Sequence, residues 1–390
     1  MALRDNAIVG YAEAKHVVRS GRDVWDFAGE ILDALLERTG LEREEIDGIV
    51  LTPSQTGSCT PFWVQSTLDF LGLETNYSDT TDLGGCSAAG GVARAAAALD
   101  AGLCETVVLI NADAPTTDNQ MKMRSFHEEW ADPVGLMGPP AAFGLLSRRY
   151  QHQYGLDLEA LGKLAVTQRA HAVLNANAVE KLRQPITVED YVNSRLIADP
   201  IRLLDCVMPC DGANGLVMMS RKRAKSKGYK RFVVPTGYGE RTNYQLAKND
   251  ADITESGHRV AGAKAFAQAK IGPWDVGSFH PYDDFLIAMM LTLEMLGFCK
   301  PGQGAAFIRE TDFRFNGDLP LNTSGGQISA GQAGLAGGGT NLIEAVRQLF
   351  GEAGERQVSN TANALVTGIG WIPYGRNWGS SVALVLTPDA

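Results

Sequence analysis

The chain has 390 residues, with 35 basic and 45 acidic side chains and a formal net charge of −10. This acidic balance disfavours a nucleic-acid-binding protein, which needs a basic surface, and 45% of apolar residues argues against a disordered chain. No apolar run reaches the roughly 18 residues of a membrane span, and the N-terminus lacks the pattern of a secretory signal, so we expect neither.

The six cysteines are scattered along the chain, which is typical of reduced thiols, and we expect a cytoplasmic protein. Cys206 and Cys210 lie close together in the sequence, but no second pair completes a zinc site. We therefore predict that no metal ion is bound and that both are buried small side chains.

The first half of the chain alternates strands with helices. We expect strands at 7–11, 48–52 and 106–110, and helices at 24–39, 62–71 and 87–101. A glycine-rich turn delivers Gly84, Gly85 and Cys86 directly before the third helix, in which small residues dominate. Residues from about 114 to 203 break this rhythm and are interpreted as an inserted, partly helical subdomain.

The second half repeats the plan after a basic stretch at 221–230, which we take as the midpoint. We expect a strand ending near His280, an amphipathic helix at 285–296, a glycine-rich turn at 322–326, a small-residue helix at 334–350, and strands at 364–367 and 382–386. The predicted domains are therefore residues 1–230 and 231–390. Helices of small residues suit a crowded layer between two sheets, because only small side chains let backbones approach closely.

Cys86 is the first candidate functional residue, since it stands where a turn leads into a helix. The positive end of the helix dipole favours a thiolate and lowers the thiol pKa. Flanking glycines let a substrate carbonyl approach backbone N–H groups. The pattern fits a nucleophile and a structural cysteine in a tight turn equally well.

Three further stretches are candidates for the site. His280 to Phe285 contains two adjacent acids at the start of a helix, which serve either as caps or, with a raised pKa, in proton transfer. Residues 322–337 form a glycine-rich run without the lysine of a phosphate loop. Thr367, Gly368 and Gly370 form a turn that brings backbone N–H groups to a site or simply connects strands.

The order of these elements resembles the thiolase superfamily, and most of all its sterol-carrier-protein type. The resemblance covers nearly the whole chain and is clearest at 200–220 (PIRLLDCVMPCDGANGLVMMS), at 293–304 (LEMLGFCKPGQG) and at 322–356, which opens with NTSGG. It implies a five-layered αβαβα fold of two similar halves, an inserted loop subdomain over the acyl-CoA entrance and a homodimer. It also implies a coenzyme A thioester as substrate and no permanently bound cofactor.

The resemblance assigns roles to individual positions. Cys86 matches the acyl-accepting nucleophile, and Gly368 lies in the last motif, where thiolases have a Cys-x-Gly turn. The family's His-Asp-Cys-Phe motif is here Tyr282-Asp283-Asp284-Phe285, so Asp284 replaces the acid/base cysteine and Tyr282 the histidine. Gln332 stands in place of the histidine of the third motif. The candidate catalytic residues are Cys86, Tyr282, Asp283, Asp284, Gln332 and Gly368.

These departures change the expected chemistry. Gln332 and Tyr282 can both donate hydrogen bonds to the oxygen of an enolate, but neither is an obvious base for Cys86. Asp284 is the natural proton-transfer group, because a carboxylate in an apolar cleft beside Asp283 has a raised pKa.

Three functions are compatible with this pattern. The retained Cys86 favours an acyltransferase that cleaves a 3-oxoacyl-CoA by thiolysis. The alternative is a retro-aldolase acting on a β-hydroxyacyl-CoA, as in thiolase-like aldolases of steroid side chains, which work with a small zinc-ribbon and OB-fold partner in a heterotetramer. A third possibility is a non-catalytic subunit that binds acyl-CoA or lipid. Lys122 and Arg124 are candidates for coenzyme A contacts, and the aromatic residues Phe62, Trp63, Trp371 and Trp378 suit either a bulky substrate or the core.

Overall fold

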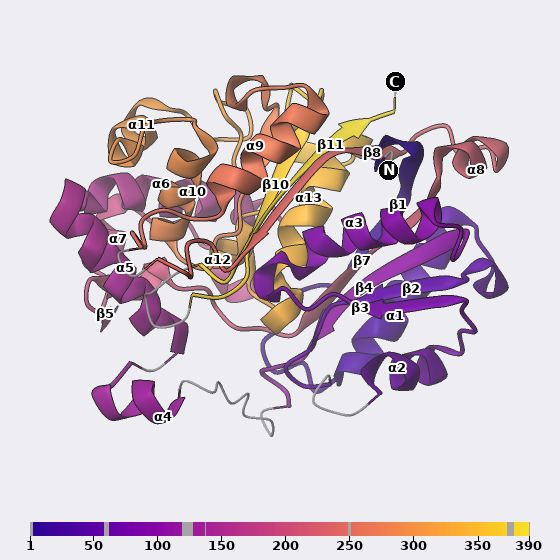
Figure 1. Ribbon diagram of the computed structural model, residues 1–390. Helices are drawn as coiled ribbons and strands as arrows, with labels where there is room; N and C mark the ends of the chain where they lie inside the picture. Colours follow the sequence, from indigo (N-terminus) through magenta and orange to yellow (C-terminus); the bar gives the residue numbers. More distant parts are fainter. Residues whose placement is uncertain are drawn as a thin grey trace.

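The computed structural model describes residues 3–57, 62–118, 128–136, 138–248, 251–372 and 378–389 (Figure 1). The first half contains β1 (Asn6–Glu13), α1 (Val24–Thr39), β2 (Gly48–Leu51), α2 (Trp63–Leu71), β3 (Tyr77–Thr80), α3 (Ser87–Asp100), β4 (Thr106–Asp113) and β7 (Gly212–Ser220). Between β4 and β7 lie α4 (Glu128–Ala131), α5 (Gly138–Tyr154), α6 (Leu158–Val173), α7 (Val188–Val192), β5 (Leu196–Ala198) and β6 (Ile201–Arg202). The insertion expected from the sequence is therefore mostly helical.

The chain crosses to the second half through α8 (Arg221–Ser226). That half contains β8 (Val233–Thr242), α9 (His258–Ala269), β9 (Ser278–His280), α10 (Leu286–Leu296), α11 (Gly304–Glu310), α12 (Gly326–Ala330), α13 (Gly337–Phe350), β10 (Ala364–Ile369) and β11 (Ser380–Pro388). Each half thus has its own strands and one long helix that begins with small residues, α3 or α13.

The strands follow the order β3-β2-β4-β7-β1 in the first half and β8-β11-β10-β9 in the second. We expected two separate mixed sheets, but β1 pairs with β8 at a single register position, Ile8 with Val233, so that the two half-sheets join at one edge. β2 runs parallel to β3 and β4, whereas β4 and β1 pair antiparallel with β7. Both half-sheets are therefore mixed.

The helices α3 and α13 lie side by side between the two half-sheets (Figure 1). Both contact strands of either half, while α1 packs on β1, β4 and β7 and α9 packs on β8 and β11. The small residues are needed for this close packing: a Cβ atom at Gly339 of α13 would lie 1.8 Å from the Asn214 side chain of β7. These layers, helix–strands–helices–strands–helix, confirm the five-layered fold.

Helix α10 differs from the expectation of an amphipathic helix. All of its side chains are buried, including Thr292 and Glu294, because α5, α6, α9 and α11 surround it. The sequence LIAMMLTLEML is apolar on nearly every face, which is the pattern of a buried helix and not of an amphipathic one. In the described part of the chain, no helix is both long and apolar enough to cross a bilayer.

Candidate active site

Cys86 closes a 3-10 turn (Gly84–Cys86) and stands directly before the first residue of α3. Its side chain is fully buried. Burial raises the pKa of the Cys86 thiol well above its usual value, and the negative charge of Glu240 adds to this, whereas a hydrogen bond with the Val382 backbone acts in the opposite direction. The expected lowering of this pKa is therefore wrong, because desolvation of the thiolate exceeds the effect of the helix N-terminus.

Gly368 lies in β10 and packs directly on Cys86. A Cβ atom at Gly368 would lie 2.6 Å from Cys86 Cα and 3.0 Å from its Sγ. Only glycine therefore fits here. The Gly368 carbonyl oxygen lies 2.9 Å from Nε2 of the buried His258, within hydrogen-bond distance. This contact helps to fix the position of β10 beside Cys86. Gly368, in the last of the four sequence motifs, therefore packs directly against Cys86.

Tyr282 follows β9 and places its ring against the turn that carries Cys86. A Cβ atom at Gly85 would lie 2.2 Å from Tyr282 Cζ, and one at Gly338 would lie 3.5 Å from Cε2. The ring is buried. Burial first, and then the negative charge of Asp284, raise the pKa of the Tyr282 hydroxyl well above its usual value, so the hydroxyl keeps its proton and is available as a donor.

Gln332 lies after α12 and completes this cluster. Its Nε2 donates to the Tyr282 hydroxyl at 3.2 Å and to Gln327 Oε1 at 3.1 Å. Its backbone is held by the segment that follows the insertion, because the Gln332 N–H donates to the Met208 carbonyl and the Cys210 N–H donates to the Gln332 carbonyl, both at 2.9 Å. Gln332 is partly exposed.

Asp283 is a fully buried acceptor of hydrogen bonds. Its Oδ1 accepts from the Gln327 N–H and from Asn341 Nδ2, each at 3.0 Å, and its Oδ2 accepts from the Ile328 N–H at 3.1 Å and from Gln168 Nε2. Burial raises its pKa while these four donors oppose the shift. Asp283 therefore ties the start of α12, helix α13 and the inserted subdomain to the residue that follows Tyr282.

Asp284 differs from its neighbour in both exposure and hydrogen bonding. It is partly exposed, and its Oδ1 is buried without a hydrogen bond from any described residue. Burial, followed by the negative charge of Asp283, raises the pKa of Asp284 to about 8, although the Phe285 N–H lowers it. Such a carboxyl group exchanges protons close to neutral pH, as a general acid or base must. The sequence likewise predicts a raised pKa for Asp284.

The structure brings the six predicted residues into one cluster between the halves. Its arrangement also includes three residues that the sequence did not single out, Gln168, Gln327 and Asn341. Gln327 lies within the glycine-rich run at 322–337, so that run is the one signal that could have indicated it. Cys210 is buried as predicted, whereas Cys206 is partly exposed. Lys122 and Arg124 lie outside the described residues.

The predicted aromatic residues have different environments. Trp63 and Trp378 are buried, while Phe62 and Trp371 are largely exposed.

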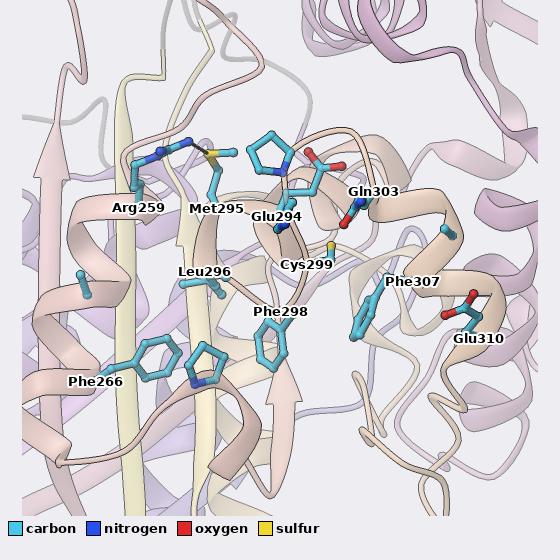
Figure 2. A pocket seen from close by; sticks show the side chains of 16 residues that line it. Arg259, Phe266, Glu294, Met295, Leu296, Phe298, Cys299, Gln303, Phe307 and Glu310 are labelled. Carbon is cyan, nitrogen blue, oxygen red and sulfur yellow. Dashed lines mark hydrogen bonds between the residues drawn. The ribbon is translucent and has the colours of Figure 1, made fainter.

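A surface cavity of about 870 Å³ lies away from the Cys86 cluster, between α9, α10 and α11 (Figure 2). Phe266, Phe298 and Phe307 line it, and it contains none of the six site residues. Its position on the outer side of the second half separates it from the Cys86 cluster.

Two α/β halves with paired central helices, one of them carrying a cysteine at its start, define a thiolase-like protein, and comparison with known families agrees. A family model described as "Thiolase C-terminal domain-like" matches residues 239–383. A steroid side-chain-cleaving aldolase of Thermomonospora curvata is 32% identical to this chain, and the match covers 93% of this chain and 94% of the aldolase. The chain belongs to the thiolase superfamily.

Other relatives agree with this assignment. A 17-hydroxy-3-oxo-4-pregnene-20-carboxyl-CoA lyase of Mycobacterium tuberculosis is 32% identical, covering 93% of this chain and 95% of the relative. Sterol carrier protein 2 of Rattus norvegicus is 27% identical over 59% of this chain and 43% of its own length. A solved structure of an Ltp2–ChsH2(DUF35) aldolase superposes with a TM-score of 0.86 at 30% identity, covering 98% of both chains.

These comparisons confirm the resemblance to sterol-carrier-type thiolases and thiolase-like aldolases. The relatives are enzymes of this superfamily, and one of them is named for a CoA thioester substrate. The relatives at 32% identity are named an aldolase and a lyase, and not acyltransferases. An acetyl-CoA acetyltransferase of Methanothermobacter thermautotrophicus is 29% identical over 94% of this chain. Thiolytic acyl transfer, the first expectation from the sequence, is therefore supported by slightly more distant relatives than the aldolase and the lyase.

Proposed function

We propose that the chain is a retro-aldolase that cleaves the bond between the α and β carbons of a β-hydroxyacyl-CoA ester. The observation that carries this proposal is the contrast between Cys86 and Asp284. The Cys86 thiol is fully buried beside the Tyr282 ring with a raised pKa, which disfavours a nucleophile. Asp284 is partly exposed with a pKa of about 8, which suits proton transfer.

The reaction needs one base and one hydrogen-bond donor. The Asp284 carboxylate takes the proton of the β-hydroxyl group, the carbon–carbon bond breaks, and the β carbon leaves as a ketone or aldehyde. The electron pair moves onto the acyl-CoA fragment as an enolate, whose oxygen accepts a hydrogen bond from the Tyr282 hydroxyl. Asp284 then returns its proton to the α carbon, so that no other reactant is consumed.

The relatives point to a bulky acyl group. Both proteins at 32% identity carry names that describe the cleavage of steroid side chains or of a hydroxylated steroid CoA ester. We propose a polycyclic β-hydroxyacyl-CoA ester of this class as the substrate. The five described cysteines are free thiols, which agrees with a reducing compartment such as the cytoplasm.

We also propose that the active assembly contains a homodimer of this chain and a small partner subunit of the zinc-ribbon and OB-fold type. The support is the similarity to the Ltp2–ChsH2(DUF35) aldolase, over 98% of both chains. Light scattering after gel filtration, with and without a co-expressed partner, measures the composition. A monomer with full activity would contradict this assembly.

The decisive experiment is product analysis in the presence and absence of free coenzyme A. Thiolysis consumes one coenzyme A for each bond cleaved and gives two CoA esters. Retro-aldol cleavage requires none and gives one CoA ester and one ketone or aldehyde. We expect cleavage of a steroid β-hydroxyacyl-CoA without added coenzyme A. An absolute requirement for coenzyme A, with an acyl group on Cys86 detected by mass spectrometry, would establish thiolysis instead.

A further inference from the structure

Gln327 is a buried residue that contacts Gln332, the hydrogen-bond partner of Tyr282. It is the second residue of α12, and its backbone N–H donates to Asp283 Oδ1 at 3.0 Å. Its side chain turns toward Gln332, and its Oε1 accepts from Gln332 Nε2 at 3.1 Å. The side chain is fully buried. Gln327 therefore connects the Asp283 cluster to the amide group that faces Tyr282.

The Gln332 amide has two N–H groups, and both are already used. One donates to the Tyr282 oxygen at 3.2 Å and the other to Gln327 Oε1. Because the Tyr282 oxygen accepts from Gln332, the Tyr282 O–H proton is left for another acceptor. In this arrangement Tyr282 has a free donor for an enolate oxygen, whereas both N–H groups of Gln332 are engaged.

Close packing fixes the positions of the two side chains, and the Gln327 Oε1 acceptor selects which end of the Gln332 amide faces it. A Cβ atom at Gly337 would lie 2.3 Å from Gln327 Oε1 and 2.7 Å from Gln332 Cγ. Both side chains therefore pack directly against the Gly337 backbone, where a larger residue would clash. Gln327 Nε2 is buried without a partner among the described residues. Turning both amides by 180° would pair that nitrogen with the Gln332 oxygen, but the Tyr282 hydroxyl would then donate to the same oxygen and lose its free proton.

We propose that Gln327 is a positioning residue that holds the Gln332 amide in the orientation in which Tyr282 keeps its hydroxyl proton for the substrate oxygen. This inference rests on the proposed retro-aldol function and deepens it. The hydrogen bonds run from Gln332 to Tyr282 and from Tyr282 to the enolate. Each donor in such a chain strengthens the next, so the orientation also makes Tyr282 a better donor.

A double-mutant cycle tests this role through kcat and KM for cleavage of a steroid β-hydroxyacyl-CoA. Gln327→Met removes the acceptor, and we expect kcat to fall about 10-fold with KM changed less than about 2-fold, the scale of one lost hydrogen bond made in the transition state. In the Tyr282→Phe background the same substitution should change kcat less than about 2-fold, because the hydroxyl on which Gln327 acts is gone.

Ser329→Ala is the matched control. Ser329 lies on the same short helix and accepts from Arg169 Nε at 3.3 Å, away from Tyr282, so its kcat should stay near that of the wild type. If Gln327→Met does not fold by thermal melting, Gln327→Asn replaces it, since its amide is one methylene too short to reach Gln332. An equal loss in the Tyr282→Phe background would overturn the inference and leave the retro-aldol proposal intact. A wild type without coenzyme A-independent cleavage would instead refute the proposed function.

Discussion

The ring of Tyr282 lies against Gly85, the residue that precedes Cys86, so closely that a Cβ atom there would be 2.2 Å from Cζ. The superfamily resemblance places a smaller histidine at the position of Tyr282. The larger phenol ring occupies the space beside the Cys86 turn, and Gly85 accommodates it. The same substitution therefore supplies a hydroxyl donor to the site and fills the space beside the turn that carries Cys86, which links the two differences from a thiolase.

The first prediction concerns Cys86. We expect Cys86→Ala to keep cleavage activity within about 3-fold of the wild type, because a buried thiol with a raised pKa takes no part in a retro-aldol reaction. The measurement is kcat for cleavage without added coenzyme A, together with a thermal melt. If a folded variant lost activity by two or more orders of magnitude, Cys86 would be the nucleophile and the retro-aldol proposal would be wrong.

The second prediction concerns Asp284. Asp284→Asn should keep the fold and acyl-CoA binding but lower kcat by about 10²-fold or more, the usual scale for a lost general acid or base. Asp82→Asn is a suitable control, because Asp82 is an exposed acid four residues before Cys86. Normal turnover in Asp284→Asn combined with an inactive Tyr282→Phe would move the proton transfer to the tyrosine.

The third prediction follows from the pKa of Asp284, which is raised to about 8. The base that removes the hydroxyl proton must be ionised, so activity should be present above this pKa and decline as the pH falls through it. A profile of kcat/KM against pH should therefore rise with an apparent pKa near 8 in the wild type. A flat profile between pH 6 and 9 in the wild type would contradict the assignment of Asp284.

Much of this architecture can be read from the sequence because its signals are local. The glycine-rich turns before α3 and at 322–326, and the small residues of α3 and of the first turn of α13, follow from short-range patterns. The direction of the Cys86 pKa could not be read in this way, since the helix N-terminus is a local feature whereas burial depends on the whole fold. Gln168 illustrates the same limit: it lies in α6 of the insertion, yet its partner Asp283 is 115 residues away in the sequence.

The last prediction concerns Asp283, for which the structure changes the expected result. From the sequence, Asp283→Asn is a mild control for Asp284→Asn. The Asp283 carboxylate, however, accepts from four donors, and an asparagine would turn an NH₂ group toward some of them. A buried donor facing another donor costs about 1–3 kcal/mol, and more where a charged acceptor is lost.

We therefore expect Asp283→Asn to lower the melting temperature clearly and to reduce kcat, because the peptide next to Tyr282 loses its anchor. Asp284→Asn should leave the melting temperature unchanged or raise it, since its carboxyl is buried on one side without a hydrogen bond. Thermal melts of the two variants separate these roles. Equal melting temperatures for Asp283→Asn and the wild type would show that the four hydrogen bonds do not stabilise the fold, and Asp283 would then be reconsidered as the proton-transfer group.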